Sequence, residues 1–206
     1  MKPEELIKCI NASCKKSISP AFNLSRCSHN YHFIHFVVDG TSYAVNNKEE
    51  QTKVLNWFDD FWLFLEIKFR LPQNKAVKNK NTEVNISLSV FHGKDTDNKK
   101  HQLLRAEWDD YDNPDEKYAQ PHWHITSNQT TENIFIEYTN EFDNQDFLPE
   151  FDDEKPKMID VKRIHFAMNG DWQNNGKHVH RIENEQQVVS WLQGMLNHLR
   201  AELENL

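Results

Sequence analysis

The stretch Leu104-Arg105-Ala106-Glu107-Trp108-Asp109 alternates apolar and polar side chains at the two-residue period of a β-strand. Arg105, Glu107 and Asp109 fall on one side of such a strand, and the apolar residues fall on the other. The pattern predicts a strand with one face toward a core and one face that stays polar.

Two further stretches, 122–126 and 163–169, show the same alternation and add histidines to it. If the three strands are neighbours, one face of a sheet carries arginines, carboxylates and three histidines at close range. The polar positions of these two stretches are His122, His124, Thr126, Arg163, His165 and Asn169.

The whole chain is predicted to form one α+β domain over residues 1–206. We expect an N-terminal helix and a hairpin within 1–45, a long buried helix over 47–70, a main sheet over 84–169 and a C-terminal helix over 184–204. Such an order is typical of a mainly antiparallel sheet with helices packed on one face. The other face is expected to be open and polar, and to bear His, Arg and Glu.

Local patterns decide these assignments. In 47–70 the large apolar residues recur at three- and four-residue intervals, which favours a helix that is apolar nearly all round. Alternation on both sides of Asp39-Gly40 predicts a hairpin over 31–45. Residues 17–28 are polar and contain Pro20, so they are expected to be irregular.

Composition excludes several classes of function. The chain has only 5 glycines and lacks both common glycine-rich phosphate-binding motifs. A net charge of −8 disfavours nucleic acid as a partner, although Lys75–Lys80 and Lys94–His101 are local basic stretches. Without a long apolar run we expect no membrane partner, whereas a protein partner fits the composition. Three cysteines and no secretion signal favour reduced thiols in the cytoplasm.

Histidine spacing suggests a divalent metal as one cofactor. His122 and His124 form a His-x-His pair, which on a strand directs both imidazoles to the same side. Zinc, manganese or iron accepts such a mixture of imidazole and carboxylate ligands. The candidate metal ligands are His122, His124, His165 and Asp109, with Glu107, Asp171, His178 and His180 as further candidates.

The same face also suits acid–base cleavage of a phosphodiester without a metal. Such a reaction needs a base, an acid and a cation that holds the phosphate. His124-Ile125-Thr126 resembles one half of the paired His-x-Thr motifs of 2H phosphoesterases, but the chain lacks the second half, so that mechanism is not transferred. The candidate catalytic residues are Glu107, His122, His124 and His165, and the candidate substrate-binding residues are Arg105, Arg163 and Asn169.

Two alternatives remain open at this point. The acidic composition and the lack of a catalytic signature equally suit a binding subunit without activity, such as an accessory or antitoxin-like protein of a bacterial complex. Cys9, Cys14, Cys27 and His29 could be written as a zinc site, but Cys9 and Cys14 diverge around a helix. The preferred hypothesis is a hydrolase of a phosphodiester or nucleotide, with or without a metal.

Overall fold

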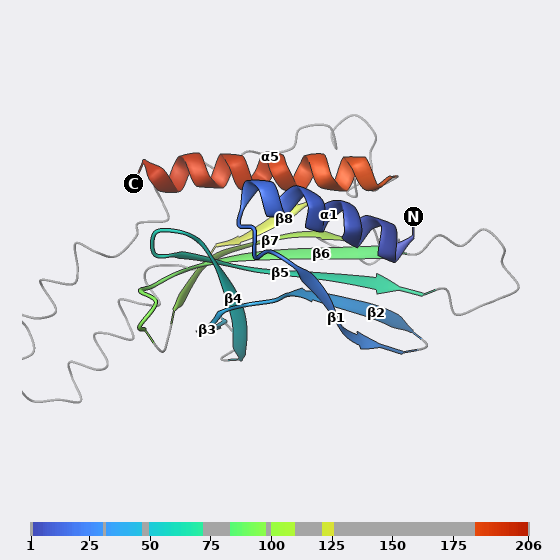
Figure 1. The fold of residues 1–206 in the computed structure, drawn as a ribbon, viewed down its shortest axis with the longest axis horizontal. Coiled ribbons are helices and arrows are strands. Elements are labelled where there is room, and N and C mark those ends of the chain that lie inside the picture. The colour runs from blue at the N-terminus through green and yellow to red at the C-terminus, as the bar shows by residue number, and fades with distance from the viewer. Residues whose placement is uncertain are drawn as a thin grey trace, which may run out of the picture.

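The computed structural model describes residues 2–30, 32–46, 50–71, 83–97, 100–109, 121–125 and 184–205. Within these ranges the chain forms two helices and one mixed sheet of eight strands, which is an α+β fold. Figure 1 shows the two helices side by side above the sheet. The elements are α1 (Pro3–Ser17), β1 (Leu24–His29), β2 (Phe33–Val38), β3 (Ser42–Val45), β4 (Gln51–Phe58), β5 (Phe61–Arg70), β6 (Glu83–His92), β7 (His101–Asp109), β8 (His122–Ile125) and α5 (Glu185–Glu204).

Both terminal helices are where the sequence predicts them. α1 begins at Pro3, has Glu4 in its first turn and Lys15 in its last, as the helix dipole favours. At the start of α5, the side chain of Asn184 accepts a hydrogen bond of 2.9 Å from the backbone N–H of Gln187. These are standard end signals, so both ends of α1 and the start of α5 are readable from sequence.

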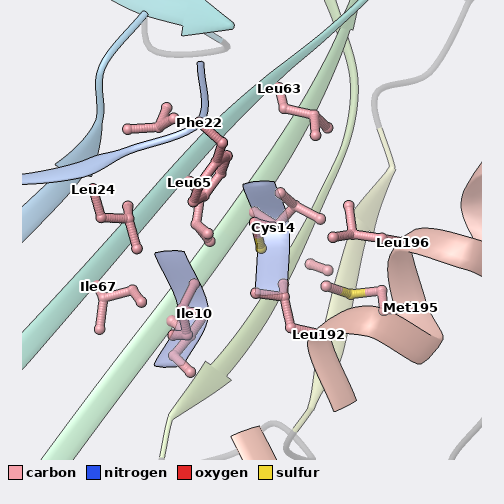
Figure 2. Close-up of a cluster of buried hydrophobic side chains, with 14 of the residues drawn as sticks. Ile10, Cys14, Phe22, Leu24, Leu63, Leu65, Ile67, Leu192, Met195 and Leu196 are labelled. Carbon is pink, nitrogen blue, oxygen red and sulfur yellow. The ribbon is translucent and has the colours of Figure 1, made fainter. Parts of the chain in front are cut away.

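The main core lies between these helices and the sheet. Ile10 and Cys14 of α1, Leu192 and Leu196 of α5, and Leu65 of β5 belong to one cluster and are at most 2 % exposed. Figure 2 shows these side chains converging from the two helices and the strands beneath. Burial of apolar area on this scale is the main force that holds the helices to the sheet.

The prediction of a long buried helix over 47–70 is wrong. The segment forms two antiparallel strands, β4 and β5, joined by a tight turn in which Asp59 has a φ of 43°. Aspartate tolerates this left-handed conformation better than most residues do. From Leu63 to Phe69 every second residue is buried, which is the two-residue period of a strand. Aromatic and β-branched residues also favour strands over helices.

The prediction of a hairpin over 31–45 is also wrong, because β2 and β3 do not pair with each other among the described strands. The backbone N–H of Asp39 donates to the carbonyl of Asn23, and that of Thr41 donates to the carbonyl of Val54. The chain thus crosses from β1 to β4 here. A Cβ on Gly40 would lie 2.5 Å from the backbone nitrogen of Val54, so the glycine permits a close crossing rather than a hairpin turn.

The segment 17–28, which was predicted to be irregular, contains most of a strand, β1. β1 pairs antiparallel with β2, with a shift of register between Arg26 and Ser28. Of its six residues only Leu24 is buried, so the strand has no apolar alternation to reveal it. The strands predicted over 104–109 and 122–126 are confirmed as β7 and β8, and β6 lies at the start of the predicted main sheet. The strand predicted over 163–169 lies outside the described residues.

Five strands pair in a closed circuit. β5 pairs with β4 and β6, β6 pairs with β7, and β3 completes the circuit by pairing with β4 and, at Val45 opposite His101, with β7. We call these five strands the ring. Ala44, Val54, Trp62 and Phe91 come from four of its strands and form a second buried cluster, separate from the main core. β5 and β6 therefore carry buried apolar side chains on both faces.

A buried lysine supports one end of the ring. Lys100 is 1 % exposed, and its ammonium lies 4.5 Å from the ring centroid of Trp62. It donates hydrogen bonds to the Ser42 hydroxyl at 2.9 Å and to the carbonyls of Asp97 and Asp95 at 3.1 and 3.4 Å. A buried ammonium is costly unless it is paired in this way. The basic stretch Lys94–His101 therefore loses this cation as a contact for nucleic acid.

Candidate functional site

The pairing of β7 with β8 brings together four of the residues that the sequence singled out. Glu107 lies opposite His122, and Arg105 lies opposite His124. The alternate residue Trp108 points the other way and makes an edge-to-face contact with Trp191 of α5, with the ring centroids 4.9 Å apart. Packing on the core side thus fixes which side chains of β7 face away from it.

Three ligand atoms of this group converge on one point. The Nε2 atoms of His122 and His124 are 2.8 Å apart, and they lie 3.3 and 3.0 Å from the same carboxylate oxygen, Oε2 of Glu107. The side chains of His122 and Glu107 are 20 % and 22 % exposed, and that of His124 is 43 % exposed. The site is accessible from solvent yet partly enclosed. We call Glu107, His122 and His124 the histidine cluster.

The geometry of the histidine cluster is close to that of a metal site. Its three ligand atoms lie within 4.8 Å of one another, and among the described residues no other group of three does so. With Zn–N distances of about 2.0–2.1 Å, tetrahedral ligands lie about 3.3 Å apart. The observed separations of 2.8, 3.0 and 3.3 Å need to widen by only a few tenths of an ångström. Two imidazoles and one carboxylate can therefore hold one divalent ion here.

Arg105 places a positive charge beside the histidine cluster. Its Nε lies 3.3 Å from Oε1 of Glu107, the carboxylate oxygen that the histidines do not contact. A guanidinium has five N–H donors, and its fork suits two oxygens of a phosphate. The group thus combines an anion-binding side chain with groups that can bind a metal or move a proton.

A second group on the same side of the sheet was missed by the sequence reasoning. Oε2 of Glu66 lies 3.0 Å from Nε2 of His35 and 3.0 Å from Nζ of Lys68. Burial alone would raise the pKa of Glu66, but the hydrogen bonds and charges of His35 and Lys68 outweigh it and lower that pKa. We call these three residues the lysine cluster. Alternation from Leu63 to Arg70 is the signal that could have revealed it.

A pocket of about 280 Å³ lies between the two clusters. Its lining includes Glu66 of the lysine cluster and His124 of the histidine cluster, with Ser87 and Arg105 between them. Cross-strand pairing explains this, because Glu66, Ser87 and Glu107 occupy successive opposed positions on β5, β6 and β7. The candidate site is therefore a pocket with the histidine cluster at one end.

The other predicted site residues are placed as follows. Asp109 lies two residues beyond Glu107 on β7, opposite Asn85, and is not one of the three converging ligands. The three cysteines are free thiols, and burial raises the pKa of Cys14 to about 12, which disfavours the thiolate that the alternative zinc site needs. Residues that lie outside the described part of the chain are His165, Arg163, Asn169, Asp171, His178, His180 and the stretch Lys75–Lys80.

Comparison with known proteins gives no relative for this chain. No family model, no curated protein and no solved structure matches it. Among the described helices none has the length and apolar character needed to cross a membrane. Function must therefore be argued from the site itself.

Proposed function

We propose that the protein is a metal-assisted hydrolase of phosphodiester or nucleotide bonds, and that Glu107, His122 and His124 hold one zinc, manganese or iron ion. The observation that carries the proposal is the convergence of two imidazole nitrogens and one carboxylate oxygen on one point. The proposal keeps the cytoplasmic location expected from sequence, with the helices on one face of the sheet and this site on the other.

Proton counting favours a cation at this point over a bare hydrogen-bond network. The three atoms make mutual contacts of 2.8–3.3 Å. Each imidazole Nε2 carries either a proton or a lone pair, and an ionised Glu107 offers only lone pairs, so at least one contact sets like against like. If both atoms are protonated, the 2.8 Å contact sets two N–H groups against each other. A single divalent ion removes this conflict, because it accepts a lone pair from each of the three atoms.

The neighbouring residues suit hydrolysis of a phosphate ester. A bound zinc-type ion polarises a phosphoryl oxygen and lowers the pKa of bound water. Arg105, 3.3 Å from Glu107, would hold the anionic phosphate next to the ion. His165, Arg163 and Asn169 remain part of the proposal as an additional acid and substrate contacts, because 163–169 has the same alternation as β7.

Metal content and affinity test the first half of this proposal. We expect near-stoichiometric metal in the purified protein by mass spectrometry, and one zinc site by calorimetry. His122→Ala/His124→Ala should lose both. The matched control is His35→Ala, which removes an imidazole that also lies 3.0 Å from a carboxylate on the same side of the sheet. Equal zinc binding by all three proteins would contradict the proposed site.

Turnover tests the second half. The metal-loaded protein should hydrolyse a chromogenic phosphodiester, bis(4-nitrophenyl) phosphate, and His124→Ala should abolish this while the far-ultraviolet circular dichroism stays unchanged. Arg105→Met should lower kcat/KM by about 100-fold, since a charge-assisted contact to phosphate contributes about 1.5–3 kcal/mol. Metal binding without turnover on phosphodiesters or nucleotides would refute the hydrolase and leave only the metal site.

A binding subunit without activity is the second candidate, and one observation favours it. Ile125, next to His124 on β8, is 50 % exposed, and Tyr43 of β3 is 47 % exposed. Exposed large apolar and aromatic side chains are of the kind that a protein partner contacts. In that case His124→Ala would change the affinity for a partner, such as the cognate protein of a bacterial complex, and no variant would change turnover.

A further inference from the structure

Side chains of different chemical types follow one another along one row of the sheet in the pocket beside the histidine cluster. Phe64 on β5, Ser89 on β6, Arg105 on β7 and His124 on β8 are successive cross-strand partners, and all four line the pocket. Neighbouring strands are about 4.8 Å apart, so Phe64 and Arg105 lie about 10 Å from each other. The row runs from an aromatic ring through a hydroxyl to a guanidinium and an imidazole.

The aromatic end of the row is held rigidly. Phe64 is half-buried and packs against the second cluster, which contains Phe91 and Trp62. One part of the Phe64 side chain is thus fixed by contacts inside the circuit of five strands, while the residue still lines the pocket. A fixed, accessible aromatic side chain is the usual platform on which a nucleobase stacks.

The middle of the row offers neutral hydrogen-bonding groups. Ser87 and Ser89 are 2 % and 5 % exposed, and the Gln102 amide donates a hydrogen bond of 3.5 Å to the Ser89 hydroxyl. Among the described residues that line the pocket, Glu66 has the one carboxylate, and the cation Lys68 at 3.0 Å reduces its repulsion of an anion. Hydroxyl and amide groups in such a place suit the polar edge of a base or a ribose.

We propose that this pocket binds a small nucleotide, with its base against Phe64 and its phosphate at Arg105, so that the phosphate ester lies beside the histidine cluster. The volume of about 280 Å³ is at the lower limit for small-molecule sites, which fits one nucleotide rather than a polymer. The inference rests on the proposed hydrolase for what happens to the ester, whereas binding of the base requires no metal.

Binding without metal tests the inference separately from the proposed function. The full-length protein in excess chelator is titrated by NMR with the four nucleoside monophosphates and with ribose 5-phosphate, which has the phosphate but no base. We expect at least one nucleotide to bind at least tenfold more tightly than ribose 5-phosphate, with saturation transfer to its base protons. Equal affinity for the sugar phosphate, or no transfer to the base, would overturn the inference.

Two variants test where the base and the phosphate of the nucleotide bind. Phe64→Leu should remove the tenfold advantage of the nucleotide and leave ribose 5-phosphate unaffected, whereas Arg105→Met should weaken both ligands. Phe33→Leu is the matched control, because Phe33 lies on β2 and is 38 % exposed. An unchanged nucleotide affinity in Phe64→Leu would contradict the proposal; if that variant does not fold, the transfer to base protons in the unaltered protein decides.

The two proposals fail in distinguishable ways. If the protein binds zinc and cleaves bis(4-nitrophenyl) phosphate but binds nucleotides no better than ribose 5-phosphate, the hydrolase stands and the nucleotide pocket is refuted. If nucleotides bind in chelator and no metal is ever held, the pocket stands and the metal-assisted hydrolase is refuted.

Discussion

The histidine cluster and the lysine cluster have the same arrangement on different strands. In each, two residues separated by one position on a strand meet one residue of the neighbouring strand. His122 and His124 meet Glu107, which lies opposite His122. Glu66 contacts Lys68 of its own strand and His35 of the neighbouring strand, and His35 lies opposite Lys68. The backbone thus presents three side chains to one point twice on the same sheet.

What differs is the third side chain, and this decides whether a carboxylate needs an external cation. In the lysine cluster the ammonium of Lys68 supplies the positive charge, and the pKa of Glu66 is lowered accordingly against the effect of burial. In the histidine cluster the third side chain is a second imidazole, and it brings a lone pair instead of a fixed charge. The comparison teaches that one side chain separates a closed ion-pair group from a candidate metal site.

Paired substitutions at the two carboxylates should give the largest contrast. Glu107→Gln removes a charged ligand and should weaken zinc binding by more than about 100-fold, because loss of even an indirect partner of a metal costs about 10–100-fold. Glu66→Gln, the corresponding substitution in the lysine cluster, should leave the zinc affinity within about twofold. Calorimetric titration measures both, and a similar loss in the two variants would mean that the clusters do not differ in this way.

Conversion of the lysine cluster into a second histidine cluster should have an intermediate effect on zinc binding. Lys68→His replaces the internal cation with a second imidazole beside His35 and Glu66, which reproduces the ligand set of the histidine cluster. The zinc stoichiometry should rise from one to two, with the new site weaker than the original. A stoichiometry that stays at one would show that shared strand geometry is insufficient for metal binding.

Acid should destabilise the lysine cluster by a smaller amount. Because the pKa of Glu66 is lowered in the folded state, its carboxylate contributes stability that is complete above its ordinary value of 4.5 and is lost as the pH falls through the lowered value. The unfolding free energy of the unaltered protein should therefore fall more steeply between about pH 5 and pH 3 than that of Glu66→Gln. Urea titrations at several pH values measure both slopes, and parallel slopes would contradict the assignment.

Sequence patterns predicted the polar strand of the histidine cluster but not that of the lysine cluster, for a physical reason. β7 has Ala106 and Trp108 in the main core and Arg105 and Glu107 on its other face, so its alternation is clear. β5 has Leu63 and Leu65 in the main core, but its other face is also apolar where Trp62 and Phe64 meet the second cluster. The first residues of β5 are thus apolar on both faces, which obscures the alternation that follows and fits a helical period equally well.

The same reasoning applies to the candidate site. Glu107, His122, His124 and Arg105 were identified from sequence because alternation on two short strands sets their direction, and pairing of β7 with β8 then brings them together. The pocket could not be foreseen, because it depends on which strands are neighbours in the ring. His35 and Glu66 are 31 residues apart, and no local pattern predicts their contact.

The turn at residues 93–97 binds a cation that belongs to the polypeptide itself, the ammonium of Lys100. This ammonium lies against Trp62 and is held by the Asp95 and Asp97 carbonyls, as a monovalent metal ion is held by backbone oxygens elsewhere. A chelator cannot remove a cation that is part of the polypeptide. A chelator therefore tests metal sites elsewhere in the protein while the cation of this turn stays in place.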